Sequence, residues 1–189
     1  MKRIYLIPLF ALMTSVLFAQ DITLSKPPAK LGMDVLDAIR VRSAARAFVK
    51  KDIPVADLST IVWAGNGLKG TTDAVSAASK AGATIPVSGD VDYVNLYVLT
   101  AKGAYLYDQQ ANVLKNVSTK DVRAEVTPEA IPEAALMILF AVDNSKAPAF
   151  LKKMPALFLQ MANGTAGYGA QNIALVAAGL KISSVVMYN

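Results

Sequence analysis

Three arginines and a serine lie close together in residues 40–48, RVRSAARAF, and these side chains are well suited to hold an anion. The planar guanidinium group donates paired hydrogen bonds to phosphate or carboxylate oxygens, and a hydroxyl adds another donor. We expect this segment to end a helix, where positive charge is favourable without any ligand. The residues alone therefore leave two interpretations open, an anion site and a solvated basic helix end.

Two further segments are candidates for ligand contact, and each also has an ordinary structural explanation. Residues 83–92 form a loop that leads into a predicted strand at Tyr93, where backbone amides beside Ser88 and Gly89 could face a ring or a phosphate. Residues 164–172 begin a glycine-rich helix, against which a flat ring or a neighbouring helix could pack closely. Composition does not separate these alternatives.

The composition excludes several kinds of site. The chain has no cysteine and no histidine, so it lacks a thiol nucleophile, the commonest metal ligand and the usual proton-transfer group near neutral pH. We therefore name no catalytic acid or base and no metal site. Removing Lys2 and Arg3 with a cleaved N-terminus lowers the formal net charge from +5 to +3, and no basic run typical of a nucleic-acid binder remains.

The N-terminus has the organisation of a secretory signal peptide. An apolar run, residues 4–18, follows the basic Lys2 and Arg3, and Ala19 supplies a small residue for cleavage. A membrane anchor is the alternative, but the run is shorter than the ~20 residues of a membrane span, and Pro8 interrupts it. We predict export to the periplasm or beyond, without a stable membrane anchor. The predicted organisation is a signal peptide over residues 1–19, an extended arm over 20–32 and one domain over 33–189.

Hydrophobic periodicity predicts the elements that must position the candidate segments. Four helices are predicted, over residues 33–43, from 54 to either 65 or 67, over 150–161 and over the glycine-rich segment after 164. Pro155 is expected to start or kink the third of them. A loop or flap is predicted over 68–82. The predicted strands are a hairpin that begins at 93–99, a central buried strand at 135–142 and a last strand at 182–187.

These segments, in this order, resemble the nitroreductase family, especially its small exported members. The family's arginine-serine motif after the first helix is similar to RSAARAF at residues 42–48, and its Leu-Ser-x-Leu-Leu-Trp-Ala-x-x-Gly motif is similar to LSTIVWAGNG at 58–67. A proline loop before a Tyr-Val strand is matched at 84–98, a Gly-x-Tyr-x-Tyr-Asp segment at 103–108 and an Ala-Gly-Tyr-x-x-Gln-Asn segment at 166–175. The resemblance covers nearly the whole chain after the signal peptide.

The resemblance implies an α+β fold with a central, mostly antiparallel sheet flanked by helices, a homodimer and an FMN cofactor. NAD(P)H would supply electrons that pass through the flavin to a small nitro, quinone or similar acceptor. The family's contacts to the FMN phosphate and ribityl chain carry over to Arg42, Ser43 and Arg46. The other cofactor contacts that we expect are Pro86, Val87, Ser88, Asp90, Gln171 and Tyr188.

Departures from the family pattern favour a rival interpretation. Ala44 and Val87 replace serines, and Asp90 and Asp92 stand where the family has amides that donate hydrogen bonds to the flavin. Ionised carboxylates would also repel a reduced, anionic flavin. We favour an enzyme, and the alternative is a non-catalytic binding or structural protein that keeps the fold with a degraded flavin site. A small-molecule binder with residues 68–82 as a lid also stays open.

The end of the sequence departs from the family as well. The family continues past its last strand with a segment that crosses to a partner subunit, whereas this sequence stops at Asn189. We expect the sequence to be a fragment that lacks this C-terminal segment, because a chain end at a core strand is physically awkward.

Overall fold

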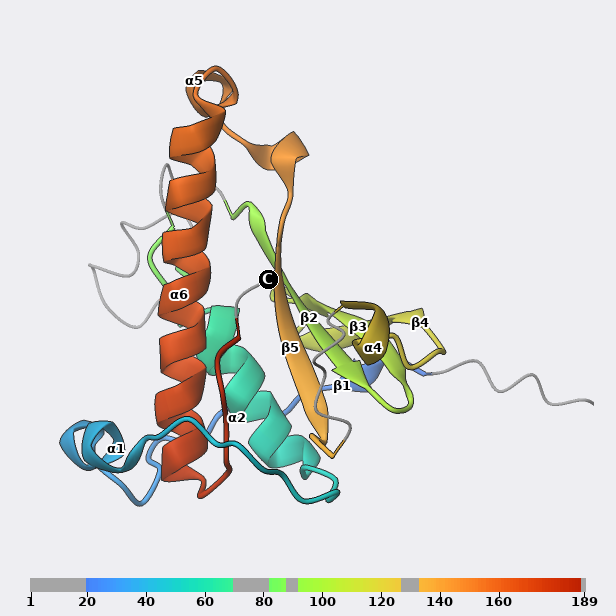
Figure 1. Cartoon of the computed structure of the whole chain (residues 1–189), viewed down its shortest axis with the longest axis vertical. Helices are drawn as coiled ribbons and strands as arrows, with labels where there is room; N and C mark the ends of the chain where they lie inside the picture. The colour runs from blue at the N-terminus through green and yellow to red at the C-terminus, as the bar shows by residue number, and fades with distance from the viewer. Residues whose placement is uncertain (1–19, 70–81, 88–91, 127–132, 188–189) are drawn as a thin grey trace, which may run out of the picture.

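A five-stranded antiparallel sheet forms one side of the molecule, and helices pack on it (Figure 1). The computed structural model describes residues 20–69, 82–87, 92–126 and 133–187. The strand order is β1-β4-β3-β2-β5, and every neighbouring pair is antiparallel. The strands are β1 (Ile22–Thr23), β2 (Val94–Thr100), β3 (Gly103–Asp108), β4 (Val113–Ser118) and β5 (Leu136–Val142). The predicted α+β architecture with a mostly antiparallel sheet is confirmed.

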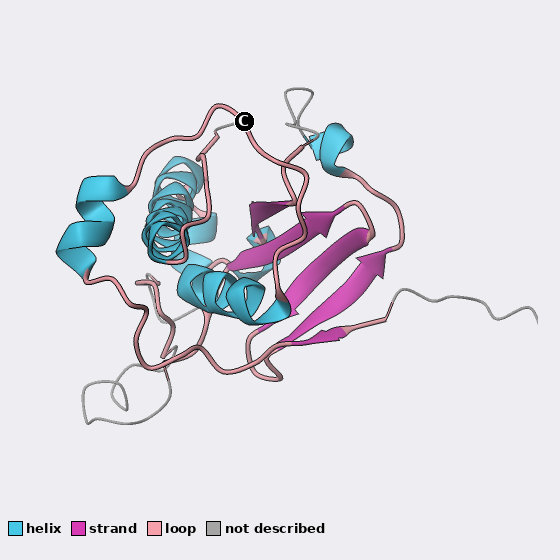
Figure 2. Cartoon of the chain, turned by 90° about the horizontal axis from the view of Figure 1, so that it is seen from below, coloured by secondary structure: helices cyan, strands magenta, loops and turns pink. Residues whose placement is uncertain are grey.

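The long helix α6 organises the helical layer. It runs from Pro155 to Gly179 and packs against α1 and α2, and α2 lies between α6 and the sheet (Figures 1 and 2). The other helices are α1 (Val35–Val41), α2 (Val55–Asn66), α4 (Arg123–Val126), the 3-10 turn η2 (Asn144–Lys146) and α5 (Ala149–Lys152). No helix in the described part of the chain, α6 included, combines the length and the apolarity needed to cross a bilayer.

Local residue chemistry explains where the helices begin. The Asp34 carboxylate accepts a hydrogen bond of 2.9 Å from the Asp37 amide and so caps the first turn of α1. Pro155 occupies the first turn of α6. Proline has no backbone N–H, which is harmless there because N–H groups in the first turn have no acceptor within the helix. Proline therefore starts α6, and the two helices predicted on either side of residue 162 are one continuous helix.

Two apolar clusters hold the layers together. In the first, Leu58 and Val62 of α2 pack against Leu96, Val98 and Tyr105 of the sheet. In the second, the ends of β2 and β5 meet the first turns of α6, where the rings of Tyr93 and Phe158 lie edge to face with centroids 5.0 Å apart. The first cluster therefore joins α2 to the sheet, and the second joins the start of α6 to the sheet.

The N-terminal arm is part of the sheet. Its strand β1 pairs with β4, Leu24 is buried, and the Ser25 amide donates a 3.0 Å hydrogen bond to the Ser59 hydroxyl of α2. Neither β1 nor β4 was predicted, because both are short and neither has a strong alternation of apolar residues. Residues 1–19 and most of the predicted flap, residues 70–81, lie outside the described part of the chain.

Two strand predictions were wrong in position or extent. Strand β5 forms where predicted, but its residues are half-buried rather than buried, and it lies at the edge of the sheet, where β2 is its partner among the described strands. An apolar run reports how the two faces of a strand are covered, and it does not tell whether one or two strands flank it. Residues 182–187 do not form a strand. Within the described residues, only Ser184 makes a bridge, and its parallel partner is Ala44 in the loop after α1.

Candidate functional site

An open cavity of about 180 Å³ lies where the end of α1 meets the end of α6. It is formed by the loop after α1, by two small residues of α6 and by the segment that follows α6. The lining residues are Val41, Arg42, Ser43, Ala45, Ala174, Ala178, Lys181, Ile182, Ser183 and Ser184. No acidic residue is among them, and they include two cations and three serines.

Backbone hydrogen bonds fix the two chain segments that face each other across this cavity. The Arg42 amide donates to the Ala38 carbonyl at 2.9 Å and ends α1. The Ala45 amide then donates to the Ser184 carbonyl at 2.9 Å, beside the bridge between Ala44 and Ser184. The basic loop and the segment after α6, far apart in sequence, are therefore held side by side.

The two cations that line the cavity have no ion-pair partner among the described residues. Arg40 makes an ion pair with Asp37 at 2.8 Å, which keeps its guanidinium on α1. In contrast, Arg42, Arg46 and Lys181 have no ion pair or side-chain hydrogen bond within the described residues. The cavity therefore offers a concentration of unpaired positive charge in a setting that an anion fits.

The second candidate segment meets the end of α2. The Thr84 hydroxyl accepts a 3.1 Å hydrogen bond from the Gly67 amide and lies 3.0 Å from the Trp63 carbonyl, to which it donates. The Asn172 side chain of α6 donates to the carbonyls of Ala64 and Thr84 at 3.2 and 3.4 Å. These contacts fix the loop that carries Pro86, which is exposed, and Val87, which is half-buried.

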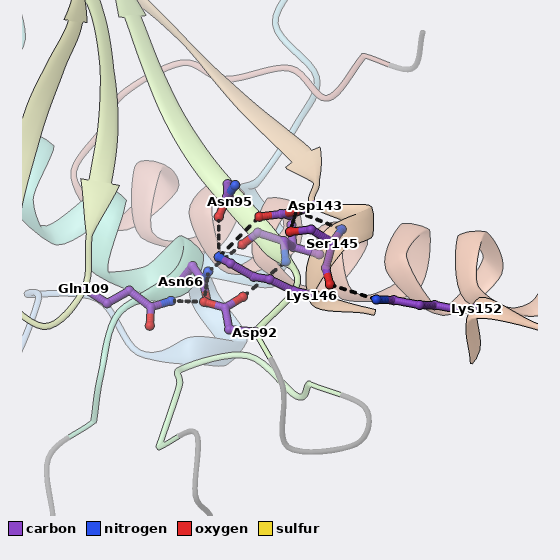
Figure 3. A network of polar contacts seen from close by, with 9 residues as sticks. Asn66, Asp92, Asn95, Gln109, Asp143, Ser145, Lys146 and Lys152 are labelled. Atoms are coloured by element: carbon purple, nitrogen blue, oxygen red, sulfur yellow. Dashed lines mark hydrogen bonds and ion pairs between the residues drawn. The ribbon is translucent and has the colours of Figure 1, made fainter. Parts of the chain in front are cut away.

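Asp92 has a structural role that the sequence did not predict. Its carboxylate accepts hydrogen bonds from the side chains of Gln109 at 2.8 Å and Asn66 at 3.3 Å, and from the Val94 amide at 3.2 Å (Figure 3). Asn66 is almost fully buried, and its Nδ2 also donates to the Val94 carbonyl at 3.1 Å. This carboxylate therefore joins the end of α2 to the start of β2 and the end of β3.

The glycine-rich part of α6 serves helix packing at one position and leaves open surface at others. A Cβ atom on Gly169 would lie 2.6 Å from the Gly65 carbonyl oxygen and 2.7 Å from the Phe140 ring, so α6 can approach α2 only because this residue is glycine. Gly164 and Gly167 are exposed, and a Cβ atom there would meet nothing within 4 Å. The packing interpretation therefore holds at Gly169.

The predicted site residues divide into three groups. Arg42 and Ser43 line the cavity, and Gln171 is exposed one turn before Ala174 on the same side of α6. Arg46 is exposed outside the cavity lining, and Pro86 and Val87 belong to the loop that Asn172 holds on another side of α6. Ser88, Asp90 and Tyr188 lie outside the described residues.

Sequence reasoning missed Lys181 and the two serines that follow it. Lys181, Ser183 and Ser184 line the cavity opposite Arg42. A lysine close to the end of a predicted helix looks like an ordinary basic helix terminus, which is favourable for the helix dipole. Only the contact between the loop after α1 and the segment after α6 identifies these residues as part of the site.

Solved structures similar to this chain support the fold assignment. A protein from Ralstonia eutropha JMP134, assigned to the nitroreductases, has a TM-score of 0.73 at 24% identity over 85% of this chain and 72% of that one. One from Anabaena variabilis ATCC 29413, also assigned as a nitroreductase, has a TM-score of 0.65 at 15% identity over 87% of this chain and 35% of that one. A chain of the E. coli microcin synthetase McbBCD complex with truncated pro-MccB17 has a TM-score of 0.51 at 12% identity, over 95% of this chain and 71% of that one.

These identities establish a shared fold only, and no curated protein matches the chain. The family model provides the stronger finding, because it covers most of the sequence and includes every segment that we singled out. With a match to the nitroreductase family over residues 39–188, the chain belongs to that family.

Proposed function

We propose that this protein is an FMN-dependent oxidoreductase of the nitroreductase type that takes electrons from NAD(P)H and reduces a nitro, quinone or similar small acceptor. Family membership supports the class of reaction. One observation carries the cofactor: Arg42 and Ser43 line a basic cavity that contains no acidic residue. Such a donor set fits the phosphate end of FMN.

The size of the cavity limits what this one chain can hold. Ligand pockets for small molecules usually measure roughly 300–1,000 Å³, and this cavity measures about 180 Å³. It has room for a phosphate and the first atoms attached to it, but not for a three-ring flavin. The ring would therefore lie outside the cavity, along the exposed side of α6 that carries Gln171.

In this proposal the residues of the chain bind and orient the cofactor. The guanidinium of Arg42 donates paired hydrogen bonds to phosphate oxygens, and the Ser43 hydroxyl adds a single donor. The chemistry supplied by bound FMN is electron transfer from a nicotinamide cofactor to the acceptor. We assign no proton transfer to a side chain, since Arg42 and Lys181 are the titratable groups among the described residues that line the cavity.

We also propose that the active form is a homodimer. Within the described residues, α1, α5 and α6 carry many large apolar side chains that are exposed, and Figure 1 shows α1 and α5 near opposite ends of α6. Exposed apolar surface on this scale is typical of a protein interface. A second copy would cover it and would complete a site whose proline loop and basic cavity lie on different sides of α6. The exposed residues are Val35, Leu36, Ile39, Val41, Phe150, Met154, Leu157, Leu159 and Tyr168.

Flavin titration of the purified chain tests the proposal. Binding of FMN should quench flavin fluorescence and shift the flavin absorbance bands, and NADH or NADPH should then bleach them. Sedimentation of the same sample gives its oligomeric state, with a dimer expected. A colourless protein whose spectrum FMN leaves unchanged would remove the oxidoreductase assignment.

A binding protein that keeps the fold without catalysis is the second candidate. Ala44 and Val87 favour it, because neither side chain can donate the hydrogen bond that a serine gives. The variant Asp90→Asn separates the two candidates. Higher FMN affinity in the variant would support a flavin site weakened by a carboxylate, and an unchanged, negligible affinity would favour the non-catalytic protein.

We further propose that the chain is exported and loses residues 1–19. The basic start, the apolar run and the small residue at Ala19 support this. Expression of the full sequence in a bacterium with a periplasm, followed by mass spectrometry of the periplasmic protein, should give a chain that begins at Gln20. Recovery of uncleaved protein in the cytoplasm alone would contradict it.

A further inference from the structure

Lys181 follows α6 in a backbone conformation that lysine rarely adopts. Its φ angle is +58°, in the left-handed region. The Lys181 amide donates to the Ala178 carbonyl at 3.0 Å, and the Ile182 amide donates to the Ala177 carbonyl at 2.8 Å. This pair of hydrogen bonds is the Schellman arrangement, in which the left-handed residue is usually glycine because glycine has no Cβ atom to clash.

Asn112, the other residue besides glycine with a positive φ in the described chain, has a local reason for it. Asparagine tolerates the left-handed region better than most residues. Its side chain also accepts a hydrogen bond from the Tyr107 hydroxyl at 3.1 Å and donates to the Leu24 carbonyl at 3.1 Å. The exposed Lys181 side chain has no such contact within the described residues. Apart from the two backbone hydrogen bonds of the Schellman arrangement, the strained backbone of Lys181 therefore gains no compensation from its side chain.

Lys181 lines the basic cavity together with Arg42 and Ser43. Strained backbone is often found at ligand sites, where a particular side chain must be presented. A phosphate monoester carries about −1.5 to −2 charges at neutral pH, and Arg42 and Lys181 together bring two positive charges to a cavity without carboxylates. The charge of the cavity therefore matches that of a phosphate monoester dianion.

We infer that Lys181 is a specificity-determining residue, which makes this site select a ligand that ends in a phosphate monoester over the same ligand without the phosphate. The inference rests on the proposed function, because it takes the cavity to hold the phosphate end of the cofactor. Arg42 supplies a directional, paired set of hydrogen bonds, and Lys181 adds a compact charge from the opposite side. A glycine at this position would relieve the backbone and lose that charge.

Two substitutions separate the binding role from a structural one. Lys181→Gly removes both the charge and the strain, whereas Lys181→Gln removes the charge and keeps the strained backbone. Lys120→Gln is the matched control, because Lys120 is also exposed, carries the same charge and lies outside the cavity lining. The affinities of the four full-length proteins for FMN and for riboflavin are measured by flavin fluorescence. Their melting temperatures are measured in phosphate and in chloride at equal ionic strength.

Both Lys181 variants should bind FMN about tenfold more weakly or worse, the loss expected for one charged hydrogen bond. Riboflavin affinity and the Lys120→Gln control should stay at the wild-type level. Lys181→Gly should melt at the wild-type temperature or up to about 4 °C higher, because the relieved strain is partly offset by the greater freedom of unfolded glycine. Wild-type FMN affinity in both Lys181 variants, or an equal loss for riboflavin, would overturn the inference and leave the proposed function standing.

If neither FMN nor riboflavin bound to any of the four proteins, this result would instead count against the proposed function. The phosphate measurements then decide on Lys181 by themselves. Stabilisation of the wild type by inorganic phosphate, absent in Lys181→Gln, would support a phosphate site that contains Lys181. Equal stabilisation of both proteins by phosphate would overturn it.

Discussion

The close approach of α6 to α2 depends on Gly169, and substitution by alanine tests this directly. The added Cβ atom would lie 2.6 Å from the backbone carbonyl oxygen of Gly65 and 2.7 Å from the Phe140 ring. The ring could shift slightly, but the carbonyl belongs to α2 and can move only with the helix. Gly169→Ala must therefore push the two helices apart or distort one of them.

Gly164→Ala is the matched control, because Gly164 lies on the same helix and a Cβ atom there meets nothing within 4 Å. Both substitutions gain the same helix propensity, about 1 kcal/mol, so the difference between the two variants isolates the clash. Overpacking typically costs about 1–3 kcal/mol. We expect a value near the upper end, since a backbone atom is involved, and a melting temperature for Gly169→Ala that is about 4–10 °C below that of Gly164→Ala.

Urea unfolding followed by circular dichroism gives both free energies of unfolding, and the slopes of the two transitions show whether both proteins unfold in one step. Two variants of equal stability would refute the packing argument, because they would mean that α6 does not approach α2 this closely. The glycine-rich segment would then be free for ligand contact along its whole length.

Three further predictions concern the site and the sheet. Arg42→Lys, which keeps the charge but loses the paired donors, should weaken FMN binding about tenfold in a fluorescence titration, and unchanged affinity would place the phosphate elsewhere. Asp92→Ala leaves the buried Asn66 amide with one acceptor fewer and should lower the free energy of unfolding by about 1–3 kcal/mol, whereas a neutral result in urea would contradict the network. Burial, with a smaller contribution from Asp108, raises the pKa of Tyr107 from 10.0 to about 12. Folding therefore favours the neutral phenol. Its contribution to stability is complete below pH 10 and is lost as the pH rises through about 12, so Tyr107→Phe should reduce the alkaline loss of stability, and an identical pH profile would refute it.

Much of the fold was predictable because the relevant signals are local. The cap at Asp34, the proline at Pro155 and the alternation in the β2–β3 hairpin each depend on a few neighbouring residues. The edge position of β5 was not predictable, since strand order depends on which other strands compete for a neighbour. Residues 182–187 have strand-like composition, but within the described chain they make only one isolated β-bridge, between Ser184 and Ala44.

The part of the candidate site that lies in residues 40–48 was predictable, because it belongs to one short segment of the sequence. Residue type indicated a possible anion site in residues 40–48 but left a solvated helix end open, and the family resemblance then pointed to Arg42 and Ser43. Lys181 was missed, since its role depends on a positive φ and on the contact between the loop after α1 and the segment after α6. The structural role of Asp92 was missed for a related reason, because its partners Asn66 and Gln109 come from separate elements.

The decisive measurement is the position of the phosphate in a crystal structure of the FMN complex. We expect phosphate oxygens about 2.7–3.0 Å from the guanidinium nitrogens of Arg42 and from the Ser43 hydroxyl, in the cavity between α1 and α6. A phosphate bound away from this cavity, or a cavity closed by side chains while FMN is bound elsewhere, would contradict it.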